Sequence, residues 1–309
     1  MSGKNVTEVR LADAAGIAQA ARCLESGGLV AVPTETVYGL AARADSAEAV
    51  ARIYAAKGRP DFNPLIVHVA SLEQAARYAD VSPEARALAE AYWPGPLTLV
   101  LPRRRDAGLA DAVTAGLPTV ALRAPAHPAM QALLAATGFP LAAPSANRSG
   151  FISPTCADHV LASLNGRIDM VIDGGPTSAG VESTIVAVRA DGSIEELRPG
   201  PLQIGVRGEG GGVKARVEAP GQLASHYAPG KPVRLNALAA EADEFLIGFG
   251  AVQSDCTLSA SGDVNEAAAR LYACLHEAAR APQPRIAVAP VPDEGVGRAI
   301  NDRLRRAAA

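Results

Sequence analysis

The chain has 309 residues, of which 49% are hydrophobic and 20% charged, with a formal net charge of −3 at pH 7. This is a globular composition that excludes a disordered chain, and the length suits two domains. The acidic balance argues against a surface built for a phosphate backbone, because such surfaces gather lysine and arginine. The four cysteines are scattered and no apolar run could span a bilayer, so we expect a reduced cytoplasmic protein without structural zinc or membrane contact.

Predicted helices and strands alternate through the first two thirds of the chain. Apolar residues at helical spacing predict a helix over 12–26 that stops at two glycines and leads into the strand LVAVPT. A capping residue and a basic last turn predict a second helix from Asp45 or Ser46 to near Lys57. The interleaving predicts an α/β or α+β domain with a mixed sheet that ends near Val206. Its other predicted elements are helices at 83–92 and 128–137 and strands at 64–70, 97–102, 119–125, 141–146, 169–175 and 183–189.

The last third of the chain has a different composition. Residues 207–230 are rich in glycine and proline without periodicity, which predicts a linker. Short strands and two helices then predict a small open α/β domain over 231–309. Its predicted elements are strands at 232–237, 245–250, 256–260 and 285–291 and helices at 264–281 and 297–308.

Four polar stretches each follow or end an apolar strand. They are PTET at 33–36, KGRPDFNP at 57–64, PSANRSG at 144–150 and GGPTSAGVEST at 174–184. Ligand sites of open α/β sheets lie beyond strand ends, so the four stretches together predict one pocket. Each stretch alone is equally typical of an ordinary turn.

Glycine-rich segments do not supply a familiar nucleotide motif. GEGGGV and GFGAVQ lack the third glycine of a dinucleotide fingerprint, and no GxxxxGK[ST] sequence is present. A nucleotide would therefore have to be held in another way.

The polar stretches resemble a known family when they are taken together. KGR followed by SAN matches the KxR…SxN signature of the YrdC-type domain, and the chain beyond the linker resembles the C-terminal domain of the two-domain threonylcarbamoyl-AMP synthases. The resemblance extends to PTETVYGL, to HYAP in the linker and to GRAINDRLRRAA near the end. It implies a YrdC-type twisted mixed sheet with helices over 1–206, a linker or lid over 207–230 that folds over the pocket, and a small Rossmann-like open α/β domain over 231–309.

The resemblance also implies a reaction. L-threonine and bicarbonate form a carbamate, whose oxygen attacks the α-phosphorus of ATP to give threonylcarbamoyl-AMP and pyrophosphate. A separate tRNA threonylcarbamoyl transferase then modifies the adenosine beside the anticodon, so tRNA is only an indirect partner. No pair of carboxylates suggests a magnesium cage, and we expect Mg²⁺ to arrive on the phosphates of ATP, with Glu182 as a possible helper.

The nucleotide site implied by the resemblance centres on two cations. Lys57 and Arg59 lie together beyond a helix, where a point charge and a planar fork suit phosphate oxygens, and they are the expected catalytic pair. Without the signature, Lys57 and Arg59 would be interpreted as solvated basic residues at the end of a helix. Ser145 and Asn147 share one face of an extended chain. The remaining implied ATP contacts are Asn63, Thr119, Ser153, Arg198 and Tyr227, of which Tyr227 could equally be a packing residue that anchors the linker.

The implied threonine site requires a partner for a carboxylate. Arg123 at a strand end could form a bidentate pair, although an exposed salt bridge is the ordinary alternative. His68 among apolar residues would otherwise be a core histidine. Thr36 is expected to terminate its strand by facing the substrate. The threonine contacts that the resemblance implies are Thr36, His68, Arg123, Ala143 and Ser183.

Two other functions remain open from the sequence. An RNA-binding module without catalysis is disfavoured by the acidic balance and by the lack of aromatic residues among basic ones. A carbamoyl-transfer domain of the hydrogenase-maturation type shares the YrdC-type core, but the acylphosphatase and zinc-finger segments that usually accompany it are not visible in the sequence.

Overall fold

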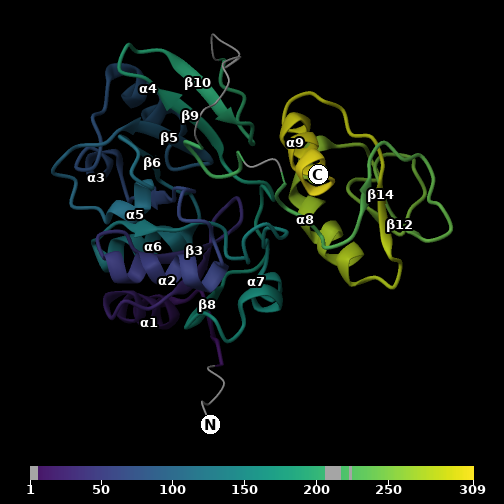
Figure 1. Cartoon of the computed structure of the whole chain (residues 1–309), viewed down its shortest axis with the longest axis horizontal. Coiled ribbons are helices and arrows are strands. Elements are labelled where there is room, and N and C mark those ends of the chain that lie inside the picture. The colour runs from purple at the N-terminus through teal and green to yellow at the C-terminus, as the bar shows by residue number, and fades with distance from the viewer. Residues whose placement is uncertain (1–5, 206–216, 223–224) are drawn as a thin grey trace.

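Two β-sheets organise the chain in the computed structural model, which describes residues 6–205, 217–222 and 225–309 (Figure 1). The described residues of the larger domain form a ten-stranded mixed sheet, and those of the smaller domain form a four-stranded parallel sheet. The expected α/β class, with a mixed sheet and a second small domain, is confirmed. The predicted boundary at Val206 and parts of the predicted linker, residues 207–216 and 223–224, lie outside the described residues, so the domain limits stay a prediction.

The large sheet runs in the order β1-β8-β2-β3-β7-β4-β6-β5-β9-β10, and the small one in the order β11-β14-β12-β13. The large sheet contains parallel pairs such as β4 with β6 and antiparallel pairs such as β2 with β3. The strands are β1 Glu8–Leu11, β2 Val30–Pro33, β3 Tyr38–Arg43, β4 Ile66–His68, β5 Leu97–Pro102, β6 Thr119–Arg123, β7 Leu141–Ala142, β8 Met170–Asp173, β9 Thr184–Val188, β10 Ile194–Arg198, β11 Val233–Arg234, β12 Glu244–Gly248, β13 Cys256–Thr257 and β14 Arg285–Val288. The helices are α1 Ala14–Glu25, α2 Ala47–Lys57, α3 Leu72–Ala75, α4 Pro83–Tyr92, α5 Asp111–Thr114, α6 Pro128–Thr137, α7 Ala157–Leu164, α8 Val264–Arg280 and α9 Gly297–Ala307.

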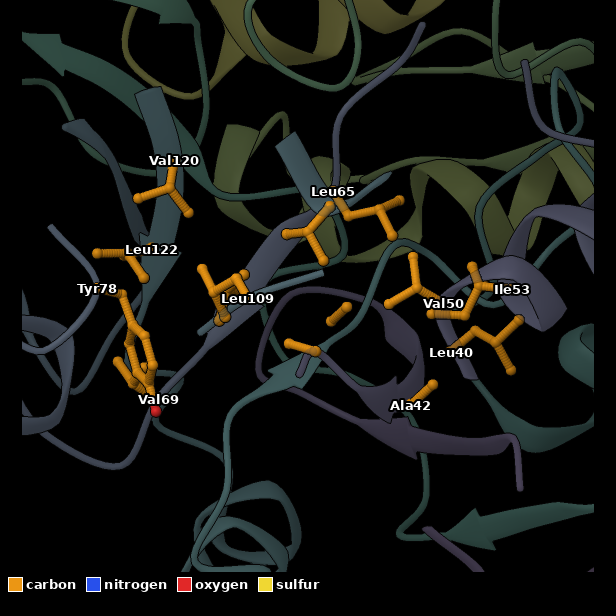
Figure 2. Packing of buried hydrophobic residues seen from close by; sticks show 14 of the residues in the cluster. Leu40, Ala42, Val50, Ile53, Leu65, Val69, Tyr78, Leu109, Val120 and Leu122 are labelled. Atoms are coloured by element: carbon orange, nitrogen blue, oxygen red, sulfur yellow. The ribbon is translucent and has the colours of Figure 1, made fainter. Parts of the chain in front are cut away.

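The core of the large domain lies between its sheet and covering helices. Leu40 and Ala42 of β3 lie beside Val50 and Ile53 of α2, and all four side chains are buried (Figure 2). Ser46 starts α2 by accepting a hydrogen bond from the Ala49 amide at 3.2 Å, as a capping residue should. The packed helix therefore delivers its C-terminal end, with Lys57, to the edge of the predicted pocket.

Several elements were not predicted from the sequence, among them β1, β3, α3, α5 and α7. The expected strand through Thr36 in fact ends at Pro33, and the chain returns antiparallel as β3, so Thr36 lies in a hairpin turn rather than at a strand terminus. β3 was not predicted because its alanines and its glycine have a low propensity for β-strands. β1 is only four residues long and mostly exposed, and α7 lacks a side-chain cap at Cys156.

The second domain packs against the first through its helices. In Figure 1, α8 and α9 lie between the four-stranded sheet and the large domain. Val37, Ile152 and Val181 of the first domain belong to the same buried cluster as the apolar residues of α8 and α9. None of the helices in the described part of the chain combines the length and apolarity that a bilayer crossing requires.

Candidate active site

A cavity forms where the ends of several strands of the large sheet meet the described part of the linker. The hairpin turn after β2, the ends of β4, β6 and β10, the segment after β7 and the segment before β9 all contribute to its wall. The predicted site residues that line it are Thr36, Arg59, His68, Arg123, Ala143, Ser145, Ser183, Arg198 and Tyr227. The other lining residues are Thr34, Val37, Gly39, Ile66, Pro144, Glu182, Pro220, Gly221 and His226.

The hairpin turn between β2 and β3 is held by its own hydroxyl groups. The Thr34 hydroxyl donates to the Val37 carbonyl at 2.6 Å, and it lies 2.9 Å from the Thr36 hydroxyl. Both threonines are buried. The polar residues of PTET therefore build a rigid turn that presents Thr36 to the cavity.

Arg123 is fixed on one wall by three partners. Its Nη1 donates to the Thr36 hydroxyl at 2.9 Å, its Nη2 to Glu35 at 2.7 Å and its Nε to the Gly95 carbonyl at 3.2 Å. Two of its five N–H donors therefore remain uncommitted within the described residues. Burial raises the pKa of the Glu35 carboxyl, but the Arg123 guanidinium outweighs it and lowers the pKa overall. Glu35 was missed from the sequence, although it sits inside PTET.

His68 lies next to Arg123 on the neighbouring strand. The parallel register of β4 and β6 pairs the two residues, so their side chains stand together. Burial and then the nearby Arg123 lower the pKa of His68 to about 3, so the imidazole is neutral at neutral pH. Its Nδ1 is buried without a partner among the described residues and can therefore receive or donate a ligand hydrogen bond.

Arg59 enters the cavity from the segment after α2. Its Nη2 donates to the Asn63 side-chain oxygen at 2.8 Å and to the Pro64 carbonyl at 2.7 Å. Burial lowers the pKa of Arg59 to about 10, which leaves it protonated at neutral pH. Asn63 itself does not line the cavity, and its contact with Arg59 orients the guanidinium.

Lys57 does not face the cavity. Its Nζ donates to the Ser145 carbonyl at 2.6 Å and also to the Asn147 carbonyl, so it ties the end of α2 to the PSAN segment. Burial and the neighbouring Arg59 place the pKa of Lys57 well below its usual range. Asn147 is likewise turned away, since its Nδ2 donates to the carbonyls of Arg148 and Phe151.

Arg198 closes the opposite wall together with the linker. Its Nη2 donates to the Ser183 carbonyl at 2.9 Å and to the Ser183 hydroxyl at 3.1 Å, and its Nη1 reaches the Pro220 carbonyl at 3.3 Å. Tyr227 is 1% exposed and has a φ of 63°, a strained value for a residue other than glycine. Tyr227 therefore lines the cavity and is also a packed residue, and its contact with ATP stays a prediction.

Two predicted contacts lie elsewhere. Ser153 donates to Glu182 at 2.6 Å and does not line the cavity. Thr119 starts β6, four residues before Arg123, and is also absent from the lining. Among the described residues, no cluster of three or more histidine, cysteine or carboxylate side chains is arranged to hold a metal ion. Glu182 is already bonded to Ser153, Tyr272 and Arg303 and is a poor metal ligand.

Comparison with known proteins covers nearly the whole chain. A family model described as "Telomere recombination" matches residues 22–200, and one described as "Threonylcarbamoyl-AMP synthase, C-terminal domain" matches residues 192–309. The chain is 42% identical to the threonylcarbamoyl-AMP synthase of Bacillus subtilis, over 94% of this chain and 92% of that protein. It is 40% identical to the protein of the same name from Pyrococcus abyssi, over 93% and 92%.

A solved structure agrees with these relatives. The crystal structure of P. abyssi Sua5 complexed with L-threonine superposes with a TM-score of 0.87 at 38% identity, covering 98% of this chain and 97% of that one. The fold and the cavity define a two-domain α/β protein with three buried arginines, Arg59, Arg123 and Arg198, in one cavity wall. The chain belongs to the threonylcarbamoyl-AMP synthase family, an enzyme family of the nucleotidyltransferase type. Family membership over the full length favours this function over an RNA-binding module or a carbamoyl-transfer domain.

Proposed function

We propose that the cavity joins L-threonine, bicarbonate and ATP into threonylcarbamoyl-AMP and releases pyrophosphate. The observation that carries this proposal is the gathering of three buried arginines, Arg59, Arg123 and Arg198, around one cavity beside the threonine hydroxyl of the PTET turn. Buried guanidinium groups suit carboxylate and phosphate oxygens, which are the charged groups of threonine and ATP. The P. abyssi relative with L-threonine bound supports the choice of amino acid.

The two ends of the cavity have separate parts in this proposal. Arg123 uses its two uncommitted donors for the threonine carboxylate, while Thr36, neutral His68, Ala143 and Ser183 complete that subsite. Arg59, Ser145, Arg198 and Tyr227 bind the nucleotide. Lys57, Asn63, Asn147 and Ser153 support this site through their bonds to its walls, and Thr119 would extend the nucleotide contact beyond the cavity.

The chemistry requires positioning and charge neutralisation. Threonine nitrogen attacks bicarbonate carbon and water leaves, a carbamate oxygen then attacks the α-phosphorus, and pyrophosphate departs. Fixed arginines around the phosphates stabilise the charge that develops, and a closed cavity protects the mixed anhydride from water. Mg²⁺ enters as the counter-ion of ATP, because this ion prefers phosphate oxygens and water as ligands.

The wider setting belongs to the same proposal. The product passes to a separate tRNA threonylcarbamoyl transferase, and tRNA is met only through that enzyme. We place the reaction in the cytoplasm, since the described cysteines are free thiols.

Substrate choice tests the proposal directly. Purified protein with ATP, Mg²⁺ and labelled bicarbonate should release pyrophosphate and form a labelled threonine adenylate. L-valine should react much more slowly, because a site built to bond a hydroxyl leaves polar groups unpaired with the isostere. Equal pyrophosphate release with valine, or no label in the adenylate, would refute the assignment.

A further inference from the structure

A buried polar cluster joins the two domains directly behind the cavity wall. Glu182 comes from the GVEST segment of the first domain and lines the cavity. Arg303 of α9 and Tyr272 of α8 belong to the second domain and are both 0% exposed. Neither of them lines the cavity, so neither would be chosen as a site residue by proximity to substrate.

Each oxygen of the Glu182 carboxylate is occupied. Arg303 Nε donates to Oε2 at 3.0 Å, the Tyr272 hydroxyl lies 2.9 Å from Oε2 and 3.0 Å from Oε1, and the Ser153 hydroxyl donates to Oε1 at 2.6 Å. Arg303 Nη1 also donates to the Pro199 carbonyl at 2.8 Å and to Asp302 at 3.0 Å. The Arg303 guanidinium lies 5.6 Å from the centre of the Tyr227 ring. One arginine of the second domain thus contacts the carboxylate, the segment after β10 and the linker tyrosine.

We propose that Arg303 is a positioning residue for the reaction, which neutralises Glu182 so that a buried carboxylate can stand beside the nucleotide-binding arginines without repelling the nucleotide. This inference rests on the proposed function, because it concerns how the same cavity accepts ATP. It assigns the second domain a part in substrate binding without any direct contact with the cavity.

The need for neutralisation follows from the position of Glu182. It shares the cavity wall with Ser183, which holds Arg198, and an unpaired carboxylate there would attract Arg198 away from the Ser183 oxygens. It would also repel the phosphates. The side chains of Arg303 and Glu182 are 0% and 8% exposed, so water and salt screen the pair little. Removing one partner would leave the other charge buried and uncompensated.

The ionisation of Glu182 provides a specific signature. Burial raises the pKa of this carboxyl, but Arg303, Arg198 and the Ser153 hydrogen bond outweigh burial and hold the pKa at about 2. Without Arg303, the strongest of the lowering influences is lost and burial drives the pKa upward. The other polar and titratable groups that face Glu182 or its ion pair are Arg198 of β10, Tyr272 of α8, Asp302 of α9, Ser153, and His226 and Tyr227 of the linker.

The experiment replaces Arg303 with methionine, which is apolar and similar in length. At about pH 8, Arg303→Met should lower kcat/KM for ATP by roughly tenfold or more, with a smaller effect on KM for threonine. Lowering the pH to about 6 should recover at least about fivefold of the loss, because protonated Glu182 no longer repels phosphate. Arg303→Lys, which keeps the charge, should retain more activity than Arg303→Met. Wild type should lack the acid recovery.

A double variant and a matched control variant separate the effect of the Arg303 charge from the effect of Arg303 packing. In the double variant Glu182→Gln with Arg303→Met, activity at about pH 8 should exceed that of Arg303→Met alone, and the acid recovery should disappear. Arg305→Met, on the same helix but exposed, should behave as wild type. If Arg303→Met cannot be purified, the double variant carries the test, and a folded double variant without ATP turnover would overturn the inference.

The outcomes distinguish this inference from the proposed function. If the wild-type protein shows no threonine-dependent pyrophosphate release, the proposed function is refuted. Calorimetric measurement of ATP binding by the same variants at the same pH values would then still test whether Arg303 supports ATP binding. An active wild type with an Arg303→Met variant whose loss is constant from about pH 6 to 8 and is not relieved by Glu182→Gln would overturn the inference.

Discussion

Two arginine–glutamate ion pairs lie at the cavity, and in each pair a different member lines it. Arg123 and Glu35, 2.7 Å apart, both belong to the first domain, and there the arginine lines the cavity. Arg303 and Glu182, 3.0 Å apart, join the two domains, and there the glutamate lines it. In the proposed reaction, the first pair presents a cation to the substrate carboxylate. The second pair would neutralise an anion in the cavity wall, so that a wall residue would depend on a partner that lies outside the cavity.

Replacing the cavity-facing arginine should have the largest effect. Arg123→Ala should cost about 2–5 kcal/mol in kcat/KM for threonine, because it removes the partner of the substrate carboxylate and leaves Glu35 without its ion-pair partner. ATP affinity by calorimetry should change little. Arg86→Ala, at an exposed helix position, is the control and should leave both quantities unchanged. A loss confined to ATP would mean that the two ends of the cavity are exchanged.

The close contact between Gly180 of the first domain and α8 of the second gives a second test of whether the second domain holds the cavity wall. Gly180 has a φ of +70°, and a Cβ built there would lie 2.3 Å from the Ala268 carbonyl oxygen of α8. Gly192 has a φ of +81°, but its Cβ would meet nothing nearer than 3.6 Å. Alanine at either position should lower the free energy of unfolding by about 1–3 kcal/mol through backbone strain alone.

Comparing these two alanine variants separates the effect of the contact between the domains from the effect of backbone strain, which both variants share. Gly180→Ala should unfold at lower urea concentration than Gly192→Ala and should lose ATP turnover, because α8 must move away and carry Tyr272 from Glu182. Gly192→Ala should keep full turnover. Matching turnover in the two variants would indicate that the second domain does not hold the cavity wall.

Sequence and structure agree best where function depends on strand ends. The PTET, PSAN and GVEST stretches could be placed at one pocket because polar residues interrupt apolar strands, and Arg123 ends such a strand. The orientation of Lys57 could not be foreseen, since only the folded PSAN segment supplies the carbonyls that it bonds. The signature positions identify which residues gather, and the three-dimensional fold decides which of them face the ligand.

Arg303 shows a second limit of prediction from the sequence, because its burial could be predicted but its partner could not. In GRAINDRLRRAA it looks like one of several basic residues at a helix end, where a dipole effect explains them all. Its spacing held a signal, because Ala299, Ile300 and Ala307 lie three or four residues away and are buried on the same face. That spacing predicts that Arg303 is buried. The carboxylate of Glu182, which compensates the buried charge, lies 121 residues away in the sequence, so the spacing does not reveal it.

The smallest expected effect concerns the other second-domain contact with Glu182. Tyr272→Phe removes one hydroxyl but keeps the ring, whose centre lies 5.7 Å from that of Tyr227. Arg303 and Ser153 still compensate the carboxylate, so the free energy of unfolding should fall by only about 1 kcal/mol. KM for ATP should rise a few-fold and KM for threonine should change less, because Glu182 precedes Ser183, which holds Arg198 of the proposed nucleotide subsite. Tyr92→Phe, at a half-buried position of the first domain, controls for loss of a hydroxyl. A loss in Tyr272→Phe as large as that in Arg123→Ala would mean that the hydroxyl, and not the arginine charge, holds Glu182 in place.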